Sequence, residues 1–336
     1  MTQYWIPYHL GPSFKRYKKR KIEDNDDMNT SMGFLLPHPK TDLIDNENVV
    51  INNLEIGHSS MQGYRVNMED AHVIEEFTGI NDHTLVGVFD GHAGKGTADY
   101  ASLCLLETIE NTKEWNSYLK LDEKRRNTPA GIELLQQALV FAYLSIDYEL
   151  INADFYDNSG STAVCAIITP NHIICANVGD SRCVLGKVDG TVVVMSEDHK
   201  PSLEEEKERI VAAGGFVFMD RVNGELAMSR ALGDFQYKAN EKLGLDCQQV
   251  IAYPDISVHE RTKNDKLLLI ACDGIWDVME NDEAITYLND IVLKEKVEET
   301  SEKMAESLIR LALEAQSTDN LSAIVCLLYT SDAADE

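Results

Sequence analysis

Short apolar runs that end at an acidic residue are the feature of this sequence that most constrains its fold. The runs 85–89 and 267–272 are followed directly by Asp90 and Asp273. An apolar run of four to eight residues is too short for a typical helix and is typical of a buried strand. We therefore expect buried β-strands with carboxylates at their ends.

Turn residues separate several further apolar runs. Pro170, Asn171 and His172 divide two of them, and the pair Asp189-Gly190 divides the next two, so this segment is predicted to be an antiparallel meander. The full prediction has strands over 85–89, 163–168, 173–178, 191–195 and 267–272, and helices over 97–109, 131–152, 203–213, 282–292 and 297–316. Strand blocks flanked by helices predict an α+β sandwich.

The charge balance and the cysteines exclude several classes of protein. Acidic residues outnumber basic ones 57 to 30, and the net charge of -27 opposes attraction to a phosphate backbone, so we expect no nucleic-acid partner. No stretch approaches the roughly 18 apolar residues of a membrane span, so no transmembrane segment is predicted. The seven scattered cysteines form no CxxC pair, which indicates neither a zinc site nor a disulfide framework.

Three aspartates, Asp90, Asp180 and Asp273, follow predicted strands and could carry chemistry. Each by itself could also cap a turn or a helix. Two carboxylates 4 Å apart repel each other by about 4 kcal/mol at an effective dielectric of 20, so a converging cluster needs cations or protons. Oxygen-only ligands favour magnesium or manganese over zinc or copper.

Nine sequence blocks resemble the type 2C metal-dependent serine/threonine protein phosphatases, and they occur in family order over about 270 residues. The blocks are RVNMEDAH at 65–72, VFDGHAG at 88–94, GSTA at 160–163, NVGDSR at 177–182, EDHKPS at 197–202, ERI with AGG up to 215, SRALGD at 229–234, ACDGIWDV at 271–278 and DNLSAIV at 319–325. This resemblance implies a four-layer αββα sandwich, with two largely antiparallel sheets flanked by helices.

The resemblance also implies a two-metal centre holding Mn²⁺ or Mg²⁺. By it, Asp90 bridges both ions, Asp273 and Asp319 complete one coordination shell, and the Gly91 carbonyl contributes to the other. The two residues expected to hold metal-bound waters are Glu69 and Asp70. The implied reaction is in-line attack on phosphorus by a water or hydroxide that bridges the two ions.

Three further roles are carried over from the family. Arg65 resembles the phosphate clamp, and His92 resembles the acid that protonates the leaving alkoxide. The aspartates Asp180 and Asp277, with Asp273 shared, resemble the ligands of a weaker third ion, although Asp277 could instead be a plain helix-start residue. Residues 203–245 correspond to the family's variable flap beside the active site.

The two ends of the chain fit the family less well. We expect an N-terminal extension over 1–50, partly disordered, a catalytic domain over 51–328 and an adapter-like tail from Cys326, artefactual or disordered over 329–336. Residues 1–31 resemble translated leader, which would make Gly33 a myristoylation candidate, but Pro37 stands where that pattern has Ser or Thr. We expect a cytoplasmic or nuclear monomer, with the basic run 15–21 either a nuclear-localisation patch or solvated charge.

Three functions remain compatible with these residues. The first is a phosphatase that acts on phosphoserine and phosphothreonine proteins. The second is a catalytically silent scaffold that binds phosphoproteins, which the presence of Asp90, Asp273 and Asp319 argues against. The third is a phosphomonoesterase for small metabolites on the same site.

Overall fold

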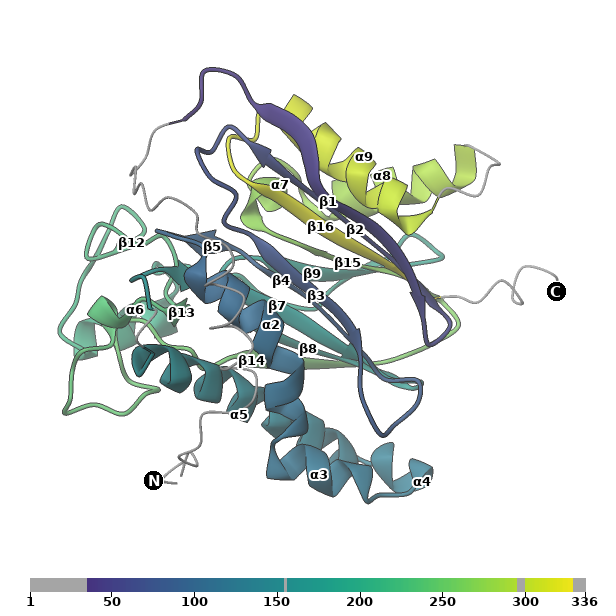
Figure 1. The fold of residues 1–336 in the computed structure, drawn as a ribbon, viewed down its shortest axis with the longest axis horizontal. Coiled ribbons are helices and arrows are strands. Elements are labelled where there is room, and N and C mark those ends of the chain that lie inside the picture. Colours follow the sequence, from purple (N-terminus) through teal and green to yellow (C-terminus); the bar gives the residue numbers. More distant parts are fainter. Residues whose placement is uncertain (1–34, 154–155, 295–299, 329–336) are drawn as a thin grey trace.

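Two antiparallel sheets packed face to face form the centre of the molecule, with helices on both outer faces (Figure 1). The structure is a computed structural model that describes residues 35–153, 156–294 and 300–328, with only the backbone described for 291–294. The four layers are helix, sheet, sheet and helix. The predicted α+β sandwich is confirmed.

The first sheet has six strands in the order β1-β2-β16-β15-β9-β10, and neighbouring strands are antiparallel. Its strands are β1 (Lys40–Ile51), β2 (Leu54–Gly63), β16 (Leu321–Leu327), β15 (Asp265–Ala271), β9 (Arg182–Lys187) and β10 (Val192–Val194). The outer face of this sheet is covered by helices α8 (Asn281–Lys294) and α9 (Ser301–Glu314) (Figure 1).

The second sheet has five strands in the order β14-β8-β7-β4-β3, again antiparallel. Its strands are β14 (Asp255–Glu260), β8 (His172–Val178), β7 (Ala163–Ile168), β4 (Thr84–Phe89) and β3 (Ala71–Glu76). The outer face is covered by α2 (Gly96–Glu110) and α5 (Pro129–Ile151), and the short helices α3 (Lys113–Leu119) and α4 (Glu123–Arg126) follow α2.

Alternating side chains explain why the strands read as continuous apolar runs. In β15, Leu268 and Ile270 point into the core between the sheets, whereas Leu267 and Leu269 pack in the cluster under α8 and α9. Successive side chains of a strand point to opposite faces, so a strand covered on both sides must be apolar at every position. The sandwich therefore follows directly from these runs.

Helix α5 is, within the described part of the chain, the one helix long and apolar enough to cross a membrane. The side chain of Thr128 accepts a hydrogen bond from the Gly131 amide, and Pro129 occupies the first turn, where its missing N–H costs nothing. Of its most apolar window, 56% is buried, and its buried residues belong to the core against the five-stranded sheet. Its composition is that of a core helix.

A small subdomain projects beside the five-stranded sheet. It contains α6 (Glu204–Ala212), β11 (Val217–Phe218), β12 (Arg221–Val222), β13 (Leu232–Gly233) and the 3-10 helix η1 (Phe235–Tyr237). Ile210, Val222 and Tyr237 form part of its own small core. Strand β13 extends a three-stranded sheet with β5 (Gly91–His92) and β6 (Gly160–Ser161), which connects the subdomain to the sandwich.

One expectation about the chain path is wrong. The meander does not continue through 163–195, because β8 lies in one sheet and β9 in the other, so the chain crosses between the sheets after Gly179. Within the predicted N-terminal extension over 1–50, the part from Lys40 onward belongs to β1 (Lys40–Ile51) and pairs with β2. Residues 1–34, including Gly33, and 329–336 lie outside the described residues.

Candidate metal centre and active site

The predicted site residues come from strand ends that meet at one end of the sandwich. Asp90 follows β4, Asp180 follows β8, and Asp273 begins the short helix α7 (Asp273–Trp276) just after β15. Asp70 precedes β3 and Asp319 precedes β16. Neighbouring strands of an antiparallel sheet run in opposite directions. The C-terminal ends of β4 and β8 and the start of β3 therefore lie at the same end of the sheet.

The carboxylates are close enough to perturb one another. Burial, followed by the charges of Asp273, Asp70 and then Asp319, raises the pKa of Asp90 well above its usual range. Burial, followed by Asp180 and then Asp319, does the same to the pKa of Asp273. Burial is also the main cause that raises the pKa of Asp70 to about 7. These residues form one cluster, which we call the carboxylate cluster: Asp70, Asp90, Asp180, Asp273 and Asp319.

Several oxygens of this cluster are buried without a hydrogen-bond partner. Among the described residues these are Oδ1 of Asp70, Oδ1 of Asp180 and Oδ1 of Asp273. A buried acceptor without a partner costs about 1–3 kcal/mol, more when it is charged. Such oxygens, grouped and acidic, fit a hard divalent cation.

A cysteine missed by the sequence analysis lies beside the cluster. One ligand atom each of Asp70, Asp90 and Cys272 lie within 4.8 Å of one another. The Cys272 thiol donates to the Asn320 carbonyl and accepts from the Ser322 amide, and burial raises its pKa well above the usual range. A thiol held protonated in this way is a poor metal ligand, so oxygen remains the donor atom of the cluster.

Arg65 and Asp319 are joined by an ion pair at the rim of the cluster. Arg65 Nε donates to Asp319 Oδ1 at 2.7 Å, and the arginine side chain is 39% exposed. Asp319 Oδ1 also accepts from the Asn320 amide at 2.7 Å. The pair holds a guanidinium over a group of carboxylates while part of it faces solvent.

Glu69 and Gly91 lie next to each other. The Glu69 amide donates to Asn320 Oδ1 at 2.9 Å, and burial raises the pKa of the Glu69 carboxyl. A Cβ at Gly91 would lie 2.3 Å from the Glu69 carbonyl oxygen. Only glycine therefore permits this approach of the two backbone segments.

His92 pairs with Asp234, which the sequence analysis did not single out. His92 Nε2 lies 2.6 Å from Asp234 Oδ2, and Asp234 is buried with a left-handed backbone, φ 53°. Burial lowers the pKa of His92, but the Asp234 carboxylate outweighs it and the net pKa is raised. The only available signal was the position of Asp234 at the end of the SRALGD block.

Asp180 and Asp277 occupy different surroundings. Lys200, also missed, donates from Nζ to Asp180 Oδ2 at 2.7 Å. Asp277 is exposed and ends α7, where its amide donates to the Asp273 carbonyl, so its alternative reading as a helix-start residue is wrong. Burial, opposed by Lys200, raises the pKa of the Asp277 carboxyl.

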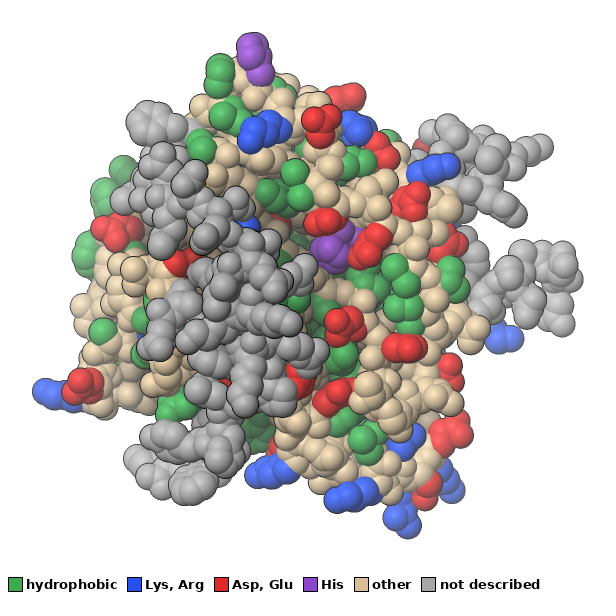
Figure 2. Space-filling model, viewed as in Figure 1, with side chains coloured by type: hydrophobic (Ala, Val, Ile, Leu, Met, Phe, Trp, Pro, Cys, Tyr) green, Lys and Arg blue, Asp and Glu red, His purple; other side chains and the backbone are tan. Residues whose placement is uncertain are grey.

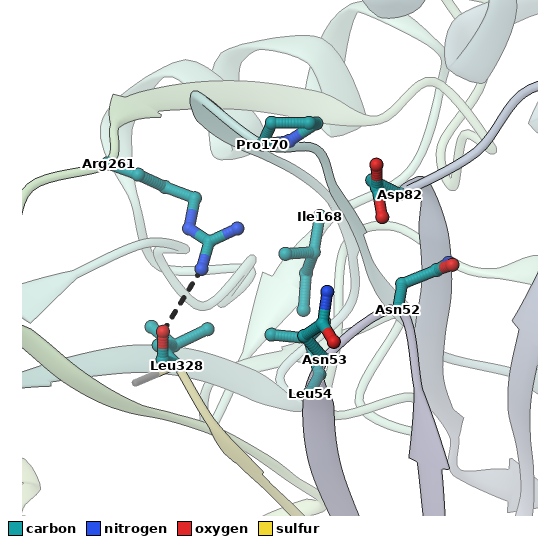
Figure 3. Close-up of a pocket in the computed structure, with 8 residues that line it drawn as sticks. All are labelled: Asn52, Asn53, Leu54, Asp82, Ile168, Pro170, Arg261 and Leu328. Carbon is teal, nitrogen blue, oxygen red and sulfur yellow. Dashed lines mark hydrogen bonds between the residues drawn. The ribbon is translucent and has the colours of Figure 1, made fainter. Parts of the chain in front are cut away.

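A cavity of about 230 Å³ lies at the opposite end of the sandwich (Figure 3). Its lining comes from the β1–β2, β3–β4 and β7–β8 turns and from Arg261, which donates to the carbonyl of Leu328. None of the carboxylate cluster lines this cavity.

The exposed basic residues of α3 and α4 are also remote from β5 and α7 (Figure 1). Figure 2 shows Lys and Arg gathered toward the lower edge of the molecule. We therefore expect the chemistry at the carboxylate cluster, at the other end of the sandwich from the cavity.

Comparison with known proteins identifies the family. The profile of the protein phosphatase 2C family matches residues 54–321, which is most of the chain. The chain belongs to the protein phosphatase 2C family. This family consists of metal-dependent hydrolases, and the resemblance based on the nine sequence blocks is confirmed.

Individual phosphatase 2C relatives support the same assignment. Protein phosphatase ppm-1.A of Caenorhabditis elegans is 39% identical, over 88% of this chain and 63% of its own length. Protein phosphatase 1B of Rattus norvegicus is 38% identical, over 91% of this chain and 78% of its own length. This chain thus spans less than two thirds of the nematode relative.

A solved phosphatase structure from Toxoplasma gondii has the same fold. It superposes with a TM-score of 0.71 at 25% identity, covering 84% of this chain and 95% of the other. The two-sheet sandwich of the phosphatase 2C family is therefore the fold of this chain.

Gly160→Ala tests whether activity depends on the contact between His92 and Asp234. A Cβ at Gly160 would lie 2.1 Å from Asp234 Oδ2 and 2.3 Å from His92 Nε2, so it must separate them. We expect kcat to fall about a hundredfold, the lower end of the contribution of a general acid, at unchanged metal requirement. Gly190→Ala is the control for backbone strain alone, because its φ of 86° disfavours alanine while its Cβ would meet no atom within 4 Å. Equal kcat in the two variants would contradict a role for the contact.

Proposed function

We propose that this chain hydrolyses phosphoserine and phosphothreonine in proteins at the carboxylate cluster, with the help of two divalent cations. The observation that carries the proposal is the convergence of buried carboxylates from separate strand ends, with Oδ1 of Asp70 and Oδ1 of Asp273 left without partners in the described structure. Acidic groups that raise one another's pKa in this way are stable as anions only when cations neutralise them.

The donor set fits Mg²⁺ or Mn²⁺, because carboxylate and carbonyl oxygens are the ligands that these ions prefer. We propose Asp90 as the ligand shared by both ions, and the remaining ligands as Asp273, Asp319 and the Gly91 carbonyl, with Glu69 and Asp70 acting through water. When bound, the two ions would lower the pKa of a water that attacks phosphorus and would neutralise the phosphoryl charge.

Arg65 is proposed to orient the phosphoryl group. Its Nε is held by Asp319 at 2.7 Å, which fixes the plane of the guanidinium. A planar guanidinium can donate two parallel hydrogen bonds to two phosphoryl oxygens, which an ammonium group cannot do. Arg65 is thereby set to bind the substrate at the edge of the acidic site.

His92 is proposed to hold the proton that the leaving serine or threonine oxygen receives. Its Nδ1 is buried without a partner among the described residues, while Nε2 faces Asp234 at 2.6 Å. With Nε2 engaged by a carboxylate, the proton available for transfer sits on Nδ1. Asp234 is thus a positioning residue whose charge also favours the protonated form of the ring.

Asp234→Asn is expected to shift the pH dependence of kcat. The carboxylate raises the pKa of His92, and the ring must be protonated to act as an acid. Without the charge the pKa falls, so kcat should decline at a lower pH than in the native enzyme, while substrate KM changes little. Unchanged pH profiles for Asp234→Asn would contradict this role.

Asp180 and Asp277 are proposed for a weaker third ion. One oxygen of Asp180 accepts from Lys200 and the other has no partner in the described structure. A third cation would therefore compete with an ammonium group for Asp180, which suits a site of lower affinity. We also propose that the catalytic domain, over residues 51–328, acts as a monomer in the cytoplasm or nucleus.

Hydrolysis of a phosphothreonine peptide is the direct test of the proposed function. We expect turnover with Mg²⁺ or Mn²⁺, loss of turnover with a chelator, and a higher kcat/KM for the peptide than for sugar or nucleotide phosphates. A preference for the small phosphates would support a metabolite phosphomonoesterase instead. Tight phosphopeptide binding without turnover would support a silent scaffold.

A further inference from the structure

Two histidines and a glutamate meet between the sheets, and none of them belongs to the carboxylate cluster. Glu47 of β1 lies directly opposite His58 of β2 in the strand register. His72 of β3 belongs to the other sheet, and its Nε2 lies 2.8 Å from Glu47 Oε1. We call these three residues the Glu47–His58–His72 cluster. It joins the two sheets where β1 and β3 form their edges (Figure 1).

Strand alternation places both histidines in the inner layer of the sandwich. Ile56 belongs to the core between the sheets, and His58 follows it by two residues in β2. Ile74 packs against the same core, and His72 precedes it by two residues in β3. Residues two apart in a strand share a face. The imidazole rings therefore stack between the sheets, with centroids 3.6 Å apart.

The buried position of His58 is energetically unfavourable, because one of its ring nitrogens has no hydrogen-bond partner among the described residues. Its side chain is only 1% exposed, and Nδ1 has no hydrogen-bond partner in the described structure. Burial, followed by the nearby His72, lowers the pKa of His58 well below its usual range, so the ring is neutral. A neutral imidazole with a free ring nitrogen is the form in which histidine binds a metal.

The geometry points to a second metal site of a different class, in which Glu47, His58 and His72 bind one divalent ion of the zinc type. One ligand atom from each residue lies within 4.8 Å of the other two. Two imidazoles with one carboxylate form a known three-ligand set for Zn²⁺, which leaves a fourth position for water. The carboxylate cluster has oxygen donors instead and favours Mg²⁺ or Mn²⁺.

Binding of one ion by both imidazoles requires the two stacked rings to rotate. Metal–nitrogen distances of about 2.0–2.1 Å place tetrahedral ligand atoms roughly 3.4 Å apart, close to the spacing of the stacked rings. The rings must open from their present angle of 19°, so that their nitrogens converge on the ion. Glu47 can move to accommodate this, since its side chain is 44% exposed and gives the ion a route from solvent.

A Co²⁺ titration in excess Mg²⁺ tests the second site, because Mg²⁺ occupies oxygen centres and Co²⁺ reports its ligands by visible absorption. We expect one equivalent of Co²⁺ to give intense four- or five-coordinate bands without a sulfur-to-cobalt transition, which excludes ligation by the exposed thiol of Cys247. Zn²⁺ should displace the Co²⁺ and raise the melting temperature. Turnover of a phosphopeptide is not part of this readout.

Variants separate the second site from other sites. His58→Leu should abolish the bands, and Glu47→Gln, an exposed change that leaves the core intact, should weaken Co²⁺ binding by about tenfold or more. The matched controls are His38→Leu and Glu76→Gln, two exposed residues outside the cluster, and both should bind Co²⁺ as the native chain does. Weak six-coordinate bands alone, or native bands in Glu47→Gln and His58→Leu, would overturn the proposal.

Discussion

Asp90→Asn is expected to lower kcat/KM for a phosphothreonine peptide by at least about a thousandfold. Asp90 is buried in the carboxylate cluster, and besides burial four acidic neighbours raise its pKa. An ion held by this group would supply several kcal/mol of transition-state stabilisation, and each 1.4 kcal/mol is a factor of ten in rate. Asp273→Asn should have an effect of similar size.

The control for Asp90→Asn is a buried aspartate at the other end of the sandwich. Asp265 begins β15, is 4% exposed and pairs with His259. Asp265→Asn should lower stability while leaving kcat/KM of the folded protein near the native value. Calorimetry of Mg²⁺ or Mn²⁺ binding should show weaker binding for Asp90→Asn only. Full activity of Asp90→Asn would refute the assignment of the catalytic centre.

The metal-free protein is expected to lose stability as the pH rises from about 4 to about 7. The pKa of Asp70 is about 7 in the folded chain, against 3.8 as its ordinary value, chiefly because of burial. A carboxyl whose pKa is raised by folding stabilises the protein fully below its unfolded pKa, and this contribution is lost as the pH passes the folded pKa. The raised pKa values of Asp90 and Asp273 act in the same direction and add to this loss.

Thermal unfolding with and without Mg²⁺ measures this effect. In chelator, the melting temperature should be higher at pH 5 than at pH 8, whereas added Mg²⁺ should raise it most at pH 8, where the carboxylates are ionised. Asp70→Asn should flatten the dependence in chelator. A metal-free melting temperature that rises steadily from pH 5 to pH 8 would contradict the clustering of these carboxylates.

Much of the core could be predicted because the apolar pattern of each buried strand reflects the surroundings of that strand alone. The run 267–272 alternates between the inter-sheet core and the core under α8 and α9, so both faces are apolar and the pattern is visible without a partner strand. Strand β1 was missed for the opposite reason. It lies at a sheet edge, most of its side chains are exposed, and its stability comes from pairing with β2, which leaves little apolar pattern.

Helices of the flanking layers were predicted to within a few residues, because a one-sided apolar stripe is also a local signal. The exceptions were short. Helices α3 and α4 follow side-chain caps at Thr112 and Asp122 and carry little periodicity of their own. Their position is determined by packing against α5. The local sequence carries no information about that contact.

The sequence by itself determined the layers and the family, because strand periodicity and ordered motifs are properties of neighbouring residues. The tertiary structure alone decided which strand ends meet, and with them the partners of the functional groups. Asp234 lies 142 positions from His92, and His72 lies 25 positions from Glu47. Such pairs depend on strand register and on the crossing between the sheets after Gly179, so no local pattern could reveal them.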